Sequence, residues 1–349
     1  MVKSEMLIPV WDTDTIWGET FMMMKDENGV AEAPFLFTPI EVLQVTSYDG
    51  KTIYEKDVDW TVANGKLRLT ENSRIYAYTY DELYPTEKPT DVASFPMNDR
   101  FLLFGEGNFF INKQITVDYT CARGSWTGIV PQLADKTLPR SFKLLRGDEP
   151  INLLFYGDSI TYGANCTSHI GINTPNVCYG KMLHYMLSQR YGDHIQYINT
   201  AKSGMDSNWA VENVEERVIE QAPDLVVLAF GMNDGAKTPE KFEDNIRKVI
   251  DATREKHPDC EFILLASSLP NPMLTDPKAQ FWGNQRFFKE NLDAIAADYS
   301  GVAVANIRDI HKYLLDHKRF MDLTSNQVNH PNDFFYRCHA HFLAGMLID

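Results

Sequence analysis

Apolar and polar positions follow one rhythm in the first part of the chain and another in the rest. Up to about residue 140, short segments alternate between the two kinds, as strands with one buried face do. Four such segments cover residues 42–48, 66–70, 74–80 and 114–120. Asn64 and Gly65 separate WTVA from KLRL and predict a two-residue hairpin, because both residues tolerate positive φ. We therefore expect an all-β domain over residues 1–140, of the sandwich or jelly-roll kind.

Residues 131–150 show neither rhythm. They are largely polar and include three prolines, Pro131, Pro139 and Pro150. Such a stretch is typical of a connection between domains, and we place the linker itself at residues 141–150.

From Ile151 onward, predicted strands alternate with predicted helices. The strands are expected at residues 151–157, 196–200, 224–230, 261–268 and 302–307. The helices are expected at 179–191, 211–221, 284–298 and 334–348, and a further one begins at Pro239. Continuous apolar runs such as INLLFYG are typical of strands buried on both faces. The alternation predicts an α/β domain over residues 151–349, with a parallel five-stranded sheet covered by helices on both sides.

Ligands of such sheets bind beyond the carboxyl ends of the strands. The first predicted strand ends in GDS at 157–159, the second leads into Gly204, the third leads into Asn233, and His330 precedes the last helix. A serine hydroxyl is a poor nucleophile unless a neighbouring base accepts its proton, and histidine suits that role near neutral pH. These residues are therefore the first candidates for chemistry.

The candidate residues belong to four blocks, GDSIT at 157–161, Gly204, GMND at 231–234 and HPN at 330–332. In this order they resemble the four blocks of the SGNH (GDSL-like) hydrolase superfamily, and the resemblance covers residues 151–349. The preceding stretch, LPRSFKLLRGDEP, also resembles two-domain bacterial members with a β-domain before the hydrolase, as in some carbohydrate esterases. The resemblance implies a flavodoxin-like, three-layer α/β/α fold for the C-terminal domain.

The same resemblance implies a role for each block. Ser159 would be the nucleophile and His330 its general base. The oxyanion of the tetrahedral intermediate would be stabilised by the backbone N–H groups of Ser159 and Gly204 and by the side-chain amide of Asn233. This chemistry needs neither a metal nor an organic cofactor.

One position departs from the family pattern. An aspartate usually stands three residues before the histidine, in the motif DxxH, and here Gln327 holds that position. Two alternatives remain open. Either a backbone carbonyl orients His330, which makes a Ser-His dyad, or Asp322 in the same loop serves as the acid.

Three further residues are candidates for contact with the substrate. Trp209 and Trp282 could stack on a sugar ring, although a core or lid role fits them equally well. Asp158 borders the nucleophile. We interpret it as a residue that fixes the loop by hydrogen bonds, and we keep it as a substrate-binding candidate.

No metal site is expected. The five cysteines include no CxxC pair, and we interpret them as reduced structural thiols. His339 and His341 stand two residues apart on a predicted helix, so they face different ways.

The charge balance limits the possible partners. A formal net charge of −15 disfavours binding to nucleic acid and to anionic membranes. No apolar run is long enough to predict a transmembrane helix, and the N-terminus lacks the apolar stretch of a secretory signal. A cytoplasmic location is therefore expected.

Three hypotheses for the function follow. In the first, the protein removes short acyl groups, above all acetyl, from a small-molecule or oligosaccharide ester. In the second, the same catalyst acts on a lipid ester or a thioester. In the third, the chain is a catalytically weak carbohydrate-binding protein, which the missing aspartate of DxxH would favour.

Overall fold

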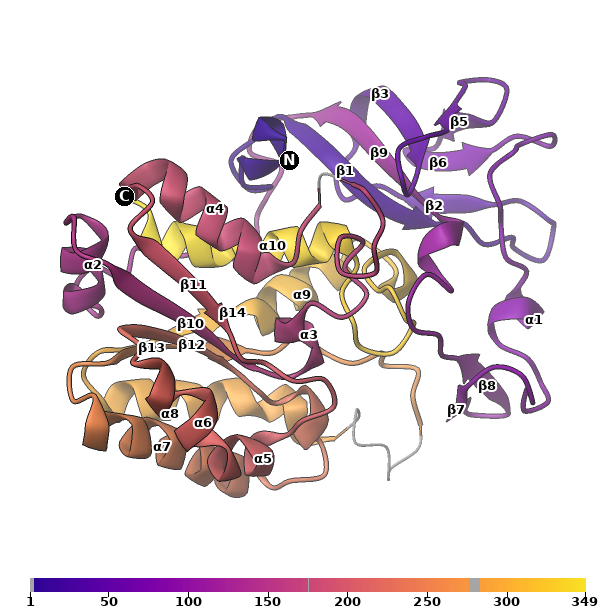
Figure 1. Cartoon of the computed structure of the whole chain (residues 1–349). Helices are drawn as coiled ribbons and strands as arrows, with labels where there is room; N and C mark the ends of the chain where they lie inside the picture. The colour runs from indigo at the N-terminus through magenta and orange to yellow at the C-terminus, as the bar shows by residue number, and fades with distance from the viewer. Residues whose placement is uncertain (1–2, 175, 276–282) are drawn as a thin grey trace.

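A computed structural model describes residues 3–174, 176–275 and 283–349. Its C-terminal part is built on a five-stranded sheet in the order β11-β10-β12-β13-β14 (Figure 1). All four pairings between neighbouring strands are parallel. The strands are β10 (Ile151–Gly157), β11 (Ile195–Asn199), β12 (Leu225–Ala229), β13 (Glu261–Ala266) and β14 (Val302–Asn306). The predicted parallel sheet is confirmed.

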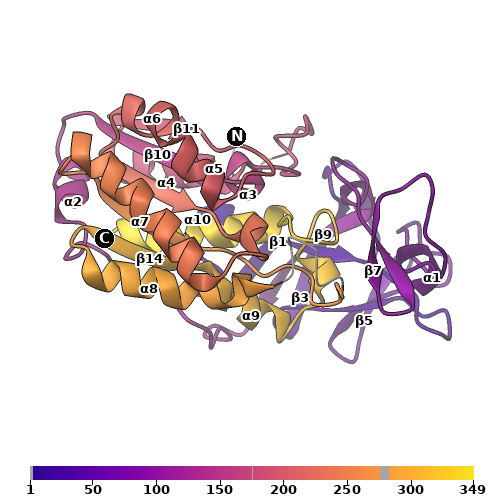
Figure 2. The ribbon, with the colours of Figure 1, turned by 90° about the horizontal axis from the view of Figure 1, so that it is seen from below.

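Helices cover both faces of this sheet, as Figure 2 shows from a second direction. One face carries α4 (Tyr179–Tyr191), α9 (Ile307–Leu315) and α10 (Asp333–Leu347), and the other carries α7 (Pro239–Lys256) and α8 (Phe288–Asp298). Alternate residues of β10 enter two different cores: Phe155 packs with the α4 side, and Tyr156 with the α7 side. This two-sided burial explains why the strands appear in the sequence as unbroken apolar runs.

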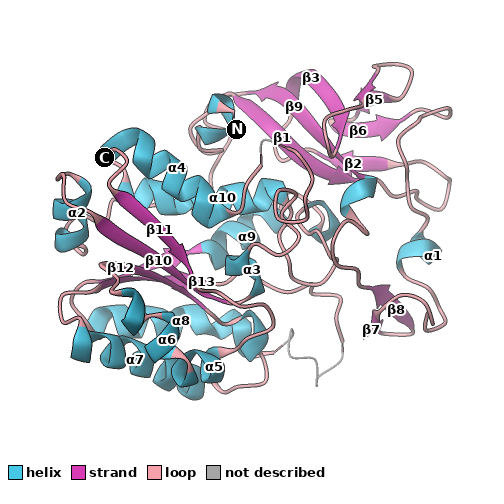
Figure 3. Cartoon of the chain, in the orientation of Figure 1, coloured by secondary structure: helices cyan, strands magenta, loops and turns pink. Residues whose placement is uncertain are grey.

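The N-terminal part consists of small antiparallel sheets (Figure 3). The largest joins β1 (Thr15–Met22), β9 (Gln114–Cys121), β3 (Pro39–Ser47) and β4 (Ile53–Tyr54). A second joins β2 (Glu32–Pro34), β6 (Lys66–Leu69) and β5 (Trp60–Ala63), and a third joins β7 (Ser94–Met97) and β8 (Arg100–Leu103). The predicted hairpin is confirmed, because Asn64 and Gly65 connect β5 to β6 with φ of 53° and 70°. A short helix, α1 (Tyr80–Leu83), follows β6.

Two predicted elements differ from the structure. Residues 74–80 form no strand and contribute one isolated bridge, between Tyr78 and Met24. Ile75 and Tyr78 are the buried members of that segment, and they stand three apart, so the alternation does not correspond to one buried face. The predicted helix at 211–221 is broken into α5 (Ser207–Glu212), α6 (Val214–Arg217) and a 3-10 turn. At the break, Asn213 has a φ of −116° and a ψ of 13°, outside the helical range, and the carbonyl of Trp209 accepts both the backbone N–H and the side-chain amide of Asn213, at 3.1 and 2.9 Å.

The predicted linker also contains structure. Helix α2 (Pro139–Leu145) begins with a proline in its first turn, and it buries Phe142 and Leu145. These side chains belong to the same core as β10 and α4.

Strand β1 packs against the C-terminal part through buried polar contacts as well as apolar ones. Lys318 forms a fully buried ion pair with Glu19 of β1. Arg337 of α10 donates to the carbonyl of Trp17, and the Gln114 side chain donates to the carbonyl of Thr324 at 2.7 Å. These contacts hold the N-terminal sheet against α10 and against the loop between α9 and α10, which carries His330.

Candidate active site

The turn after β10 places Ser159 at the carboxyl edge of the sheet. Gly157 permits this turn, because a Cβ at that position would lie 2.5 Å from the carbonyl oxygen of Ala229. Asp158 caps the short helix α3 (Ser159–Tyr162) by accepting a hydrogen bond from the backbone N–H of Ile160 at 2.9 Å. Ser159 is thus the first residue of α3, and its backbone N–H has no acceptor among the described residues.

His330 lies directly against the serine. Its Nε2 is 2.9 Å from the Oγ of Ser159, and both residues are buried. The loop before α10 is held by Asn326, whose side-chain oxygen accepts the backbone N–H groups of residues 328, 329 and 330 at 2.9–3.0 Å. The carbonyl of His330 in turn accepts the N–H of Ser325 at 2.9 Å. The loop therefore presents the imidazole in one orientation.

Gly204 and Asn233 lie in the same pocket as Ser159 and His330. Gly204 has a φ of 78°, which suits glycine, and its N–H has no acceptor within the described parts of the chain. The Asn233 amide donates one hydrogen bond to the carbonyl of Met205 at 2.9 Å, which ties the loops after β11 and β12 together. Its second N–H group is left for a ligand. The four predicted blocks thus converge on one site.

The pocket has a volume of about 380 Å³ and receives two residues from the N-terminal part of the chain. Its lining residues in the described structure are Phe104, Glu106, Ser159, Ala164, Ser203, Gly204, Asn233, Asn329 and His330. Phe104 and Glu106 follow β8, so the segment after that strand forms one wall.

A carboxylate contacts the second nitrogen of the imidazole, and it comes from Glu106. The Oε2 of Glu106 is 3.2 Å from Nδ1 of His330. Glu106 was not among the residues predicted from the sequence. No motif marks it, because it stands 224 positions before the histidine in a different part of the fold.

Gln327 and Asp322 make other contacts. The Gln327 amide is buried and points to the sulfur of Met22, at 3.8 Å. The Asp322 carboxylate is fully buried. It accepts hydrogen bonds from the backbone N–H of Met22 and from Nε and Nη2 of Arg319, all at 2.9 Å. Burial would raise the pKa of Asp322, but the Arg319 and Lys318 charges outweigh it and lower the pKa. The structure does not bring Asp322 into hydrogen-bond contact with His330 within its described residues.

Of the three residues predicted to contact substrate, the two that the structure describes do not line the pocket as the four blocks do. Asp158 is buried beneath the turn, and burial raises its pKa to about 7. Trp209 packs its ring against Tyr156 and Phe230, with centroid separations of 5.7 and 6.4 Å, and does not line the pocket. Trp282 lies outside the described residues.

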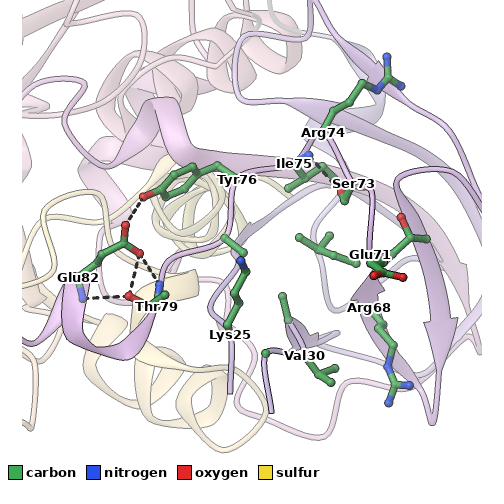
Figure 4. Close-up of a pocket in the computed structure, with 15 residues that line it drawn as sticks. Lys25, Val30, Arg68, Glu71, Ser73, Arg74, Ile75, Tyr76, Thr79 and Glu82 are labelled. Carbon is green, nitrogen blue, oxygen red and sulfur yellow. Dashed lines mark hydrogen bonds between the residues drawn. The ribbon is translucent and has the colours of Figure 1, made fainter. Parts of the chain in front are cut away.

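A larger cavity of about 820 Å³ lies on the N-terminal part, between β6 and residues 73–82 (Figure 4). It shares no lining residue with the pocket around Ser159. In this cavity the Glu82 carboxylate accepts hydrogen bonds from the backbone N–H of Thr79 and from the hydroxyl of Tyr76, at 2.6 and 3.0 Å. The serine and histidine therefore mark the smaller pocket as the candidate active site.

The cysteines and the two histidines of α10 are packing residues of the core. All five cysteines are buried and free. His339 and His341 on α10 lie against the backbone carbonyls of Phe335 and Met6, both at 2.8 Å. Within the described ranges, no three metal-ligating side chains are grouped closely enough to hold an ion. The same ranges contain no helix with the length and apolar character needed to span a membrane.

Comparison with known proteins decides the family. Residues 155–338, more than half of the chain, match the model of the GDSL-like lipase/acylhydrolase family. The chain belongs to this family. The matched region includes the serine, glycine, asparagine and histidine of the pocket, so the resemblance expected from the four blocks is confirmed.

The relative reported for this GDSL-family chain is distant. It is 22% identical over 243 residues to an uncharacterised protein of Mycoplasma pneumoniae, and it spans about a quarter (26%) of that protein's length.

Two solved structures are similar in part. A two-domain esterase active on acetylated mannans has a TM-score of 0.49 and 17% identity, over 62% of this chain and 53% of its own, so the chain spans about half of its length. A catalytic mutant of Axe2, an acetylxylan esterase from Geobacillus stearothermophilus, has a TM-score of 0.46 and 19% identity over 57% of this chain and 94% of its own.

Proposed function

We propose that this GDSL-family protein is a serine ester hydrolase that removes short acyl groups, above all acetyl, from carbohydrate esters. The observation that carries the proposal is the 2.9 Å contact between Ser159 Oγ and His330 Nε2, in a pocket that also presents Gly204 and Asn233. This is the arrangement of a nucleophile, its base and a set of oxyanion donors.

The reaction proceeds through an acyl-enzyme. Ser159 Oγ attacks the ester carbonyl carbon while His330 Nε2 takes its proton, and the carbonyl oxygen becomes an anion. The backbone N–H groups of Ser159 and Gly204 and the free N–H of Asn233 stabilise that anion. The intermediate collapses as His330 returns the proton to the leaving alkoxide. Water then attacks the acyl-serine with the same base and releases the carboxylic acid.

The lining of the pocket supports a short acyl group on a polar substrate. Among the described lining residues, Phe104 and Ala164 are the apolar side chains, so little apolar surface is available for a long acyl chain. Ser203, Asn329 and Glu106 offer hydrogen-bonding groups of the kind that sugar hydroxyls require.

The test is hydrolysis of p-nitrophenyl acetate and p-nitrophenyl octanoate by the wild type and by Ser159→Ala. We expect turnover of acetate that the substitution abolishes, with far slower turnover of octanoate. Incubation of the wild type with different acetylated oligosaccharides, followed by measurement of the released acetate, then shows which sugar the protein accepts. Faster octanoate turnover would favour a lipid ester or thioester instead. If the wild type binds sugar, and neither the wild type nor the variant hydrolyses these esters, the result would favour a carbohydrate-binding protein.

A further inference from the structure

The environment of Nδ1 of His330 determines what its Nε2 can do. For Nε2 to accept the serine proton, the proton of the neutral ring must sit on Nδ1. A carboxylate at Nδ1 stabilises that tautomer, and it also stabilises the imidazolium that forms during attack. In this chain the carboxylate of Glu106 occupies that place, at 3.2 Å.

Glu106 is itself held in position by the loop that carries the histidine. Its Oε1 accepts a hydrogen bond from the Asn326 amide at 3.2 Å, while Oε2 faces the imidazole. Asn326 is the residue whose side-chain oxygen binds the backbone N–H groups before His330. One asparagine therefore fixes both the histidine backbone and the carboxylate.

The ionisation of Glu106 agrees with this role. Burial would raise its pKa, but hydrogen bonds from His330 and Asn326 outweigh the burial, so the pKa lies below its usual value. The group is therefore an anion at neutral pH, and its partial exposure, 46% of the side chain, also favours the charged form.

The segment that carries Glu106 is anchored on both sides. Before it, the N–H of Phe104 donates to the carbonyl of Ala93 at 2.8 Å. After it, Gly107 donates to the Asn165 side chain at 3.3 Å, and Phe110 is fully buried. Phe110 belongs to a core that also includes Met321 and Val328, from the loop around the histidine.

We propose that Glu106, supplied by the N-terminal part of the chain, is the positioning residue for His330. The triad of this enzyme is then divided between the two parts of the fold, and the β-rich part completes the active site. The inference rests on the proposed function, because it assigns a role in the reaction of Ser159. It replaces both a backbone carbonyl and Asp322 as the orienting group, and it explains how Gln327 can occupy the usual aspartate position.

The first test compares Glu106→Gln with Glu106→Asp in ester hydrolysis. Glutamine keeps the shape but can donate an N–H to Nδ1, which favours the wrong tautomer, so kcat should fall roughly 10²- to 10⁴-fold. KM should change less than about threefold, because the proposed role is in the transition state. Aspartate keeps the charge, so kcat of Glu106→Asp should be at least about tenfold higher than kcat of Glu106→Gln. The matched control is Glu87→Gln, at an exposed glutamate of the same region, which should behave as wild type.

A double substitution separates positioning from a general structural effect. In a His330→Ala background, Glu106→Gln should cause no further loss of the residual activity, because the residue acts through the imidazole. The inference is overturned if Glu106→Gln lowers kcat in the His330→Ala background by the same factor as in the wild type. It is also overturned if kcat of Glu106→Gln alone stays within threefold of wild type. Far-UV circular dichroism and the thermal midpoint check that each variant is folded.

A spectroscopic test does not depend on turnover. The Nδ1–H of His330 against a carboxylate should give a strongly downfield proton resonance, which disappears in Glu106→Gln and in His330→Ala and persists in Glu87→Gln. Absence of the signal from the wild type, or its survival in Glu106→Gln, overturns the inference. An inert wild type that still shows the signal contradicts the proposed function alone, whereas a Ser159-dependent activity unaffected at Glu106 contradicts this inference alone.

Discussion

The buried ion pair between Lys318 and Glu19 allows a quantitative prediction about how the two parts of the chain are held together. Neither side chain is exposed. In Lys318→Met, the Glu19 carboxylate keeps two donors, the N–H of Leu36 at 3.0 Å and the hydroxyl of Tyr119 at 2.6 Å, but it loses its counter-charge. Breaking one side of a buried pair costs about 3–5 kcal/mol.

The assay is urea unfolding followed by far-UV circular dichroism. With an m-value of roughly 3 kcal/mol per M, the predicted loss lowers the midpoint by about 1 to 1.7 M urea. Because a neutral pair of similar volume avoids the unpaired charge, the double variant Glu19→Gln/Lys318→Met should recover at least half of that shift. Lys248→Met is the control, since Lys248 pairs with Asp244 on an exposed helix face.

Two results would refute this reasoning. The first is a midpoint of Lys318→Met no lower than that of Lys248→Met, which would mean that the buried carboxylate tolerates the loss of its partner. The second is a double variant less stable than Lys318→Met, which would mean that the cost comes from packing and not from the uncompensated charge.

Three further predictions concern the active-site loops. Gly157→Ala should lose most of the esterase activity and some thermal stability, because its Cβ would clash with a backbone carbonyl 2.5 Å away; wild-type kinetics would contradict this. Gln327→Asp should not rescue Glu106→Gln, because the side chain at 327 points to Met22 and not to the imidazole; recovery of kcat would show that the loop can rearrange. Asp158 has a pKa raised by burial to about 7, so its folded form binds a proton that the unfolded chain releases near pH 4, and its contribution to stability falls as pH rises from about 4 to 7. Asp158→Asn should flatten that dependence by on the order of 1 kcal/mol per pH unit, measured by urea unfolding between pH 5 and 7; identical slopes in the two proteins would contradict the assignment.

Most of the C-terminal fold and four of its site residues could be predicted from the chain itself. Strands buried on both faces leave continuous apolar runs, and helix α4 was expected at its observed bounds, 179–191, from a stripe of apolar positions. Ser159, Gly204, Asn233 and His330 each follow a strand or precede a helix, and the carboxyl ends of parallel strands meet at one edge. Local pattern was therefore enough to bring them together.

The local pattern of apolar and polar residues did not predict the secondary structure correctly where contacts with other segments determine it. Residues 74–80 alternate like a strand but find no neighbouring strand along their length. The helix expected at 211–221 is interrupted at Asn213, whose φ of −116° lies outside the helical range. In both cases the backbone conformation depends on its surroundings, which sequence periodicity does not encode.

The contact partner of His330 shows most clearly which information came from the sequence and which from the structure. The sequence by itself determined the candidate serine and histidine and the parallel sheet that brings them together, because each depends on periodicity and on short motifs. Only the tertiary structure decided that Gln327 points to Met22, that Asp322 is bound by Arg319, and that Glu106 faces Nδ1. The physical reason is that this last contact joins residues 224 positions apart, through the docking of one part of the fold on the other.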